Sequence, residues 1–122
     1  MFNFTAAEEK CLSERAHVSS ILSSEEQAFL WNDHRLSKHW LGAKYINGAW
    51  TWLDRSPWDF TSWGETEPSN PEVENCLERL SSIWNDVQCD KIYHARGLPF
   101  ACKKGKLYNY LPKNSIKIKS QN

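Results

Sequence analysis

The sequence predicts an α+β fold in one small domain. Two segments with helical spacing come first, and short segments with the alternation typical of strands follow them. The chain has 122 residues, which suits a single domain. Its seven tryptophans supply large rings that can fill a compact core without long helices. Four cysteines would allow such a domain to be closed by disulfides.

The first helix is expected over residues 6–16. Thr5 is a suitable N-cap, and Glu8 follows three residues later as in a capping box. Ala7 and Cys11 recur at the spacing of one helical face. This face is therefore expected to be buried.

A second helix is expected over roughly residues 24–34. Ser23 or Ser24 can cap its N-terminus, and two glutamates in the first turn suit the positive end of the helix dipole. The spacing of its apolar residues predicts which side chains are buried. These are Ala28, Phe29 and either Trp31 or Asn32.

Short strands are expected in the rest of the domain. Asn47-Gly48 is a strong hairpin signal between two strand-like segments. The expected strands cover residues 17–21, 40–43, 50–52, 76–80, 83–87 and 99–103.

Residues 54–75 form an irregular, mostly polar segment that contains three prolines. A loop of this length is uncommon in a compact domain unless it carries a function. Trp58, Phe60 and Trp63 lie within it. These aromatic side chains predict a packed loop that is held against the core.

Charge is unevenly distributed, although the formal net charge is zero. Residues 1–102 hold nine basic and fifteen acidic side chains, a net charge of −6, while residues 103–122 hold six lysines and no acid. The acidic body argues against nucleic acid as a partner and suits a bound cation. No segment has the apolar length of a membrane span, so membrane insertion is not expected. The basic tail is expected to be solvated, with an electrostatic tether to acidic surfaces as the alternative.

The four cysteines stand at positions 11, 76, 89 and 102. They form no CxxC pair, which argues against a zinc or redox site. Four cysteines allow three pairings, and a nested pairing would close one short loop and the whole domain. Four free thiols are less expected in so small a domain. The cysteines therefore favour a secreted, extracellular protein.

The order of these elements resembles the C-type lectin-like domain over residues 2–103. The residues that carry the resemblance are Cys11, Trp40-Leu41-Gly42, Trp63-Gly64-Glu65, Glu67-Pro68-Ser69, Glu74-Asn75-Cys76, Trp84-Asn85-Asp86-Val87, Cys89 and Cys102. The resemblance implies two helices, two small antiparallel sheets, a long calcium-binding loop and the disulfides Cys11–Cys102 and Cys76–Cys89. It places the carbohydrate-recognition domain in residues 1–104 and leaves residues 105–122 as a lysine-rich extension.

In sugar-binding members of that family, the calcium ligands come from a Glu-Pro-Asn triplet, a glutamate before the third cysteine and a Trp-Asn-Asp motif. Carried over to this sequence, the ligands are Glu67, Ser69, Glu74, Asn85 and Asp86. Calcium takes roughly six to eight oxygen ligands, and this set supplies several of them. The resemblance also implies a cis peptide bond before Pro68, with an ordinary trans turn as the alternative.

Ser69 departs from the family pattern, which has an asparagine at this position. Asn70 is the alternative ligand, because the loop is about one residue shorter than in common relatives. The residues expected to contact two vicinal sugar hydroxyls are Glu67, Ser69, Asn70, Glu74, Asn85 and Asp86. The glutamate at the start of the triplet favours mannose- or fucose-type sugars, and the missing amide leaves galactose open.

The resemblance thus implies a secreted, calcium-dependent lectin. Its expected partner is carbohydrate on glycoproteins or cell surfaces, and assembly into homo-oligomers would raise its avidity. The alternative is a calcium-independent lectin-like domain that binds a protein, a mineral surface or ice. An enzyme with Glu67 and Glu74 as a glycosidase carboxylate pair is not expected, because both acids are better explained as ligands.

Overall fold

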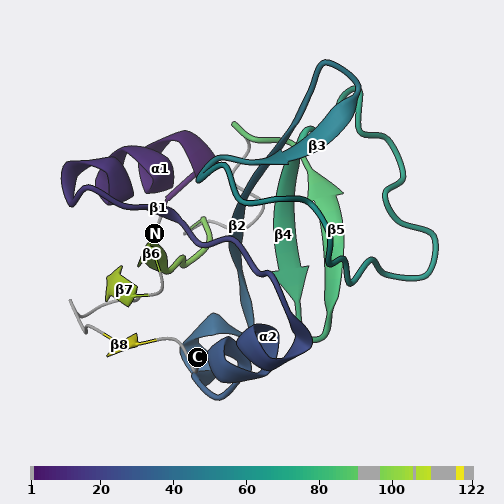
Figure 1. Ribbon diagram of the computed structural model, residues 1–122. Helices are drawn as coiled ribbons and strands as arrows, with labels where there is room; N and C mark the ends of the chain where they lie inside the picture. Colours follow the sequence, from purple (N-terminus) through teal and green to yellow (C-terminus); the bar gives the residue numbers. More distant parts are fainter. Residues whose placement is uncertain (1, 91–96, 106, 111–117, 120–122) are drawn as a thin grey trace.

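The computed structural model describes residues 2–90, 97–105, 107–110 and 118–119. Two α-helices and two four-stranded antiparallel sheets in these residues confirm the α+β prediction (Figure 1). The helical elements are α1 (Phe4–Ser13), α2 (Ser24–Trp31) and the 3-10 helix η1 (His34–Leu36). The strands are β1 (His17–Val18), β2 (Lys38–Ile46), β3 (Ala49–Trp52), β4 (Cys76–Leu80), β5 (Ile83–Val87), β6 (Cys102–Lys104), β7 (Leu107–Tyr110) and β8 (Ile118–Lys119). Within this described part of the chain, neither α-helix has the length and apolar character that a membrane crossing requires.

The two sheets lie in different parts of the domain. One has the strand order β1-β6-β7-β8, and the other has the order β3-β2-β4-β5, in which β5 is an edge strand. Strands β4 and β5 have the bounds that the sequence predicts, whereas β2 is longer and β6 is shorter than expected. Strands β7 and β8 fall within the expected lysine-rich extension, where their backbone continues the first sheet. The rest of that extension beyond residue 105 lies outside the described residues.

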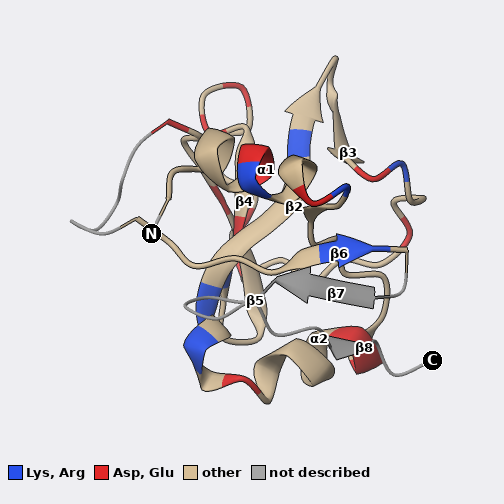
Figure 2. Cartoon of the chain, turned by 90° about the vertical axis from the view of Figure 1, so that its left-hand side faces the viewer, with Lys and Arg blue, Asp and Glu red and all other residues tan. Residues whose placement is uncertain are grey.

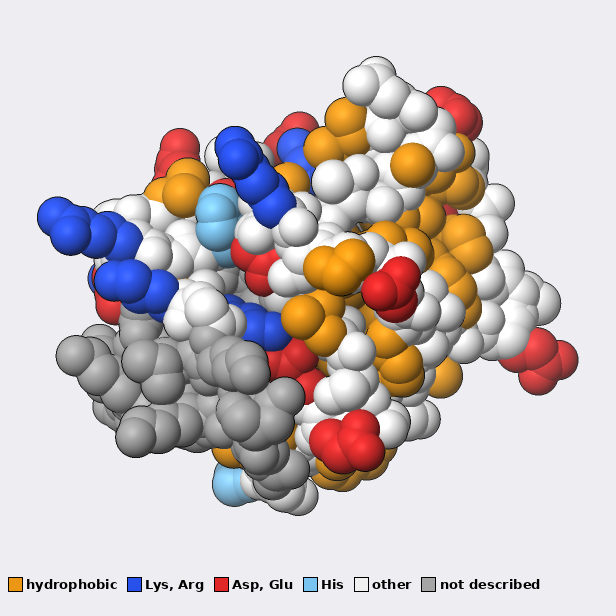
Figure 3. All heavy atoms as spheres, viewed as in Figure 1, with side chains coloured by type: hydrophobic (Ala, Val, Ile, Leu, Met, Phe, Trp, Pro, Cys, Tyr) orange, Lys and Arg blue, Asp and Glu red, His pale blue; other side chains and the backbone are white. Residues whose placement is uncertain are grey.

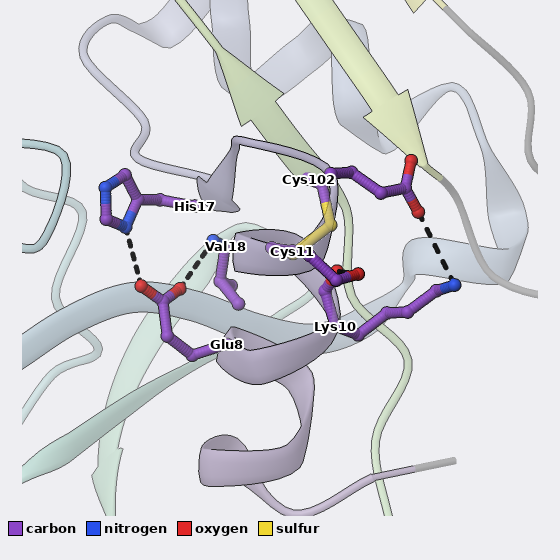
Figure 4. Close-up of a disulfide and its surroundings, with 8 residues drawn as sticks. Glu8, Lys10, Cys11, His17, Val18 and Cys102 are labelled. Carbon is purple, nitrogen blue, oxygen red and sulfur yellow. Dashed lines mark hydrogen bonds and ion pairs between the residues drawn. A yellow bond between two sulfur atoms is a disulfide. The ribbon is translucent and has the colours of Figure 1, made fainter.

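Helix α1 begins two residues earlier than the sequence predicts, because Asn3 and not Thr5 is its N-cap. The Asn3 side chain accepts a backbone N–H of the first turn at 2.9 Å. Glu8 therefore does not complete a capping box. Its carboxylate instead lies 2.6 Å from His17 Nδ1 and accepts the Val18 backbone N–H at 2.9 Å, which ties α1 to β1 (Figure 4).

The predicted buried face of α2 is wrong. Ser23 caps the helix as expected, through a 3.0 Å hydrogen bond from the Glu26 backbone N–H. The expected apolar stripe, however, is turned mostly toward solvent, and Trp31 is 46% exposed. The side chains that are buried instead are Glu26, Gln27 and Leu30.

Two polar contacts explain why α2 buries hydrophilic side chains. Glu26 and Lys103 form an ion pair of 2.6 Å in which both side chains are almost fully buried. Gln27 accepts the Trp84 indole N–H at 2.7 Å. Helix α2 is thereby attached both to β6, whose lysines are blue in Figure 2, and to β5 of the other sheet.

The hairpin between β2 and β3 turns at Asn47-Gly48, as the sequence predicts. Both residues have positive φ angles, 51° and 82°. This backbone conformation suits the type I′ turns that match the twist of antiparallel strands.

The long loop between β3 and β4 is packed, as its aromatic residues predict. Trp58, Phe60 and Trp63 contact a buried cluster that contains Trp52 and Trp84. The ring centroids of Trp58 and Trp52 are 4.7 Å apart, and those of Trp58 and Trp84 are 5.8 Å apart. These rings hold an otherwise irregular segment beside β5.

Both disulfides implied by the resemblance are present, and no cysteine is free. Cys11–Cys102 joins α1 to β6 across 91 residues of sequence (Figure 4). Cys76–Cys89 joins the start of β4 to the segment after β5. The nested pairing therefore closes the domain and, separately, the hairpin that carries the candidate site.

A buried histidine and a buried arginine face each other across β2 and β4. His39 and Arg79 are opposite in the strand register, and neither is accessible to solvent. The Arg79 guanidinium donates to the backbone carbonyls of Gln27 and Leu36. Burial lowers the pKa of His39 to about 3, and the nearby Arg79 charge acts in the same direction. His39 is therefore neutral at physiological pH.

We predict that Lys103→Met destabilises the domain by about 3–5 kcal/mol, because it leaves the buried Glu26 carboxylate without its cation. Urea denaturation of both proteins would measure this loss. Lys104→Met is the matched control, since Lys104 is the exposed neighbour on the same strand. Equal stability of the two variants would contradict a structural role for the ion pair.

We predict that His39 makes the domain sensitive to acid. Its pKa is about 3 in the folded state, well below its ordinary value of 6.5, so its contribution to stability is complete above pH 6.5 and is lost as the pH falls toward 3. The expected slope is about 1.4 kcal/mol per pH unit below pH 6.5. His39→Gln should flatten this slope in denaturation curves, and His34→Gln, at an exposed site, should not. Parallel slopes for wild type and His39→Gln would refute the assignment.

Candidate functional site

The candidate site lies where the long loop between β3 and β4 meets the edge strand β5 (Figure 1). Asp86 of β5 is only 1% exposed. Its Oδ1 accepts the Ser69 backbone N–H at 2.9 Å, and its Oδ2 accepts the Asn70 backbone N–H at 2.8 Å. Hydrogen bonds to an ionised acceptor are stronger than neutral ones. This carboxylate therefore fastens the loop to the strand through both of its oxygens.

Ser69 also brings Glu74 to the same place. The Ser69 hydroxyl oxygen lies 3.3 Å from Glu74 Oε1 and 3.3 Å from Asp86 Oδ1. The Glu74 backbone N–H donates to the Asn70 carbonyl at 2.8 Å, which closes the turn between these residues. The loop thus folds back so that the Ser69 and Glu74 side chains lie close together beside Asp86 of β5.

Glu67 adds a third carboxylate beside Asp86. The peptide bond between Glu67 and Pro68 is cis, as the resemblance implies. Burial raises the pKa of Glu67 above its usual value, and a hydrogen bond with the Asp86 carboxyl raises it further. Burial opposes the ionisation of Asp86 as well, but the N–H donors of Ser69 and Asn70 lower the pKa of Asp86 overall. Asp86 is thus the acid of this pair that is readily ionised.

The chemistry of these side chains fits a hard divalent cation such as calcium. The Glu67 Oε1 atom is buried and has no hydrogen-bond partner among the described residues. A cation would offset the crowding of like charges and would favour the ionised form of Glu67. Across residues 2–90 and 97–105, however, no three His, Cys, Asp or Glu side chains already stand in a metal-binding arrangement. Asp86 directs both oxygens at backbone donors instead.

Asn85, the remaining predicted ligand, is hydrogen-bonded to strand β4 and not to the loop. It lies opposite Glu78 in the register of β4 and β5, and its Nδ2 donates to Glu78 Oε2 at 2.9 Å. Glu78 is not among the site residues that the sequence predicts. The only sign of it in the sequence is that a glutamate lies within the strand-like segment 76–80. In the structure this side chain is 5% exposed, so it points inward. The structure therefore joins Ser69, Glu74 and Asp86 directly, and it joins Asn85 to a residue that was not predicted.

Close packing against β5 supports the middle of the loop. Gly64 donates its backbone N–H to the Trp84 carbonyl at 3.0 Å. A Cβ atom at Gly64 would lie 2.8 Å from the Ile83 side chain, so a larger residue would displace this contact. Trp84 is fully buried beneath the loop, and its ring packs edge-on against Trp63. Hydrophobic side chains gather on the side of the molecule that carries β3 and this loop (Figure 3).

Comparison with known proteins places the chain beside C-type lectin domains. A family model described as the lectin C-type domain matches residues 2–104. C-type lectin domain family 4 member F of Mus musculus is 35% identical over 109 residues, which cover 80% of this chain and 19% of that protein. The aligned segments cover 52% of a type-2 ice-structuring protein of Brachyopsis segaliensis and 32% of asialoglycoprotein receptor 2 of Rattus norvegicus. The chain thus spans only part of these proteins.

Two solved structures resemble the domain. The C-type carbohydrate-recognition domain of cow CD23, solved in the presence of a GlcNAc2Man3 oligosaccharide, is 32% identical with a TM-score of 0.67 and covers 74% of this chain and 73% of that one. A calcium-independent type II antifreeze protein is 27% identical with a TM-score of 0.65 and covers 73% of this chain and 72% of that one. The fold is therefore shared by proteins with different ligands.

We predict that Asp86→Ala destabilises the domain even in EDTA. The substitution removes the acceptor of two backbone N–H groups, which should lower the free energy of unfolding by about 1–3 kcal/mol. Chemical denaturation in the chelator measures this change. Asp90→Ala, which alters an exposed acid four residues later, is the control and should have little effect. A wild-type value for Asp86→Ala would mean that the loop does not depend on this carboxylate.

Proposed function

Because the chain belongs to the C-type lectin domain family, we propose that it binds carbohydrate through a calcium ion at the junction of the long loop and β5. The observation that carries this proposal is the convergence of oxygen-bearing side chains from separate segments on one place. Glu67, Ser69 and Glu74 come from the loop, and Asp86 comes from β5. We infer a binding role and not a catalytic one, because each of these acids has a use as a ligand.

The proposed calcium ligands are Glu67, Ser69, Glu74, Asn85 and Asp86. When bound, calcium would offer open coordination positions that two vicinal sugar hydroxyls can fill. The ligand side chains contact the same hydroxyls: the carboxylates of Glu67 and Glu74 accept hydroxyl protons, and the Asn85 amide donates a hydrogen bond. The chain thus orients the sugar, since each hydroxyl needs both a donor and an acceptor at a fixed place.

The proposed sugar class follows from the two side chains of the triplet, Glu67 and Ser69. Glu67 at the start of the triplet favours mannose- or fucose-type hydroxyls. Ser69 offers one donor where an asparagine would offer two, so the site keeps galactose as a further candidate. Asn70 stands next to Ser69, and its backbone already contacts Asp86 at 2.8 Å, which supports it as an additional sugar contact.

A second candidate function is ligand binding without calcium, on a protein, a mineral surface or ice. Two observations favour it specifically. Asp86 satisfies both of its oxygens with backbone N–H groups of the loop, so the loop is held without an ion. A calcium-independent antifreeze protein also resembles this domain.

The setting of the proposed lectin is extracellular. Two disulfides support a secreted protein, because such bonds persist in oxidising compartments. Carbohydrate on glycoproteins or cell surfaces is the proposed partner, and homo-oligomers would raise the avidity of a shallow single site. The domain is proposed to comprise residues 1–104, with the lysine-rich residues 105–122 as its extension.

A glycan array with and without calcium tests the proposal. We predict that glycan binding depends on calcium. We also predict that Glu74→Gln weakens calcium affinity about tenfold or more, as changes at metal sites commonly do. Glu72→Gln is the matched control, because it removes the same charge from an exposed position in the same loop. A wild-type array that is blank in calcium, or unchanged in EDTA, would contradict the calcium-dependent function and favour the second candidate.

A further inference from the structure

We propose that Glu78 is the positioning residue that sets the direction of the Asn85 amide at the calcium site. The inference rests on the proposed function and adds a residue from outside the predicted ligand set. Glu78 is on β4, one strand in from the edge, and it is 5% exposed. Its Oε2 atom is 2.9 Å from Asn85 Nδ2.

The contact with Glu78 determines the direction of the Asn85 amide. A carboxylate oxygen accepts a hydrogen bond, and only the NH2 end of an asparagine side chain can donate one. The contact with Glu78 therefore fixes Nδ2 toward β4. Because the oxygen and nitrogen of an amide diverge from the same carbon, Asn85 Oδ1 is turned away from β4, toward the open edge of the sheet.

The position of Asn85 relative to Asp86 limits where one ion can contact both side chains. Successive residues of a strand point to opposite faces of a sheet, and Asp86 lies under the loop. One ion can be reached by both neighbours only at the rim of the sheet, and β5 is an edge strand. An Asn85 oxygen directed outward from β4 suits that position, whereas an outward NH2 group would oppose a cation.

The contact with Glu78 also limits the hydrogen bonds that Asn85 can donate to a sugar. The Asn85 amide has two hydrogens, and one of them is engaged by Glu78. One hydrogen remains for a sugar hydroxyl, and Ser69 also offers a single donor in place of an amide. We infer that the site carries fewer hydrogen-bond donors than the family pattern implies, so calcium coordination contributes the larger share of sugar affinity.

Calcium titration by calorimetry tests this role through a double-mutant cycle. Glu78→Gln should weaken calcium binding roughly tenfold in the wild-type background, because glutamine can present either end to Asn85 and releases the fixed direction. In an Asn85→Ala background, Glu78→Gln should change calcium affinity by less than about twofold, the range of independent sites. Glu72→Gln measures the loss of one charge alone, and thermal unfolding of each variant reports whether it folds.

The outcomes separate this inference from the proposed function. A tenfold loss in both backgrounds, or no loss in either, would overturn the role of Glu78 while calcium binding by the wild type stands. A wild type that binds no calcium would overturn the proposed function and this role together. The side-chain amide signals of Asn85 in NMR spectra give a reading that does not use calcium. Glu78→Gln should shift these signals in the calcium-free protein, and unchanged signals would also refute the contact.

Discussion

The contact between the Asp86 carboxylate and the backbone of Ser69 and Asn70 is the constraint on which the site depends. The loop that carries these residues has little regular structure, so its shape must come from a few fixed points. Asp86 supplies one of them at Ser69 and Asn70, and packing of Gly64 against Trp84 and Ile83 supplies another. Between these points the chain folds back far enough for Glu74 to approach Ser69.

The same carboxylate links the two candidate functions. As a ligand, Asp86 would share its oxygens with an ion, whereas its present donors are the N–H groups of the loop. The loop is therefore ordered by its own backbone before any cation contributes. A family that contains both sugar-binding and calcium-independent members is physically reasonable on this scaffold, since losing the ion does not remove the contact that seats the loop.

Much of this arrangement could be predicted from the sequence because it depends on short motifs in a fixed order. The disulfide pairing, the strands β4 and β5 and the meeting of Ser69, Glu74 and Asp86 belong to that class. The buried face of α2 does not, because helical spacing cannot reveal that Glu26 meets a lysine on β6. The Glu78–Asn85 contact also depends on strand register, and a lone glutamate in a strand-like segment does not disclose it.

The buried residues that stabilise the fold are separate from those that form the candidate site. Glu26 with Lys103 and the Cys11–Cys102 bridge hold the sheet that contains β6, away from the loop. Neither of these two contacts involves a residue of the loop. Exposed positions such as Ser69 can therefore differ from the family pattern without unfolding the domain, while buried Asp86 is constrained by its two backbone partners. Variation in ligand class is thus expected at the exposed residues of the loop, and the strand beneath them keeps its acid.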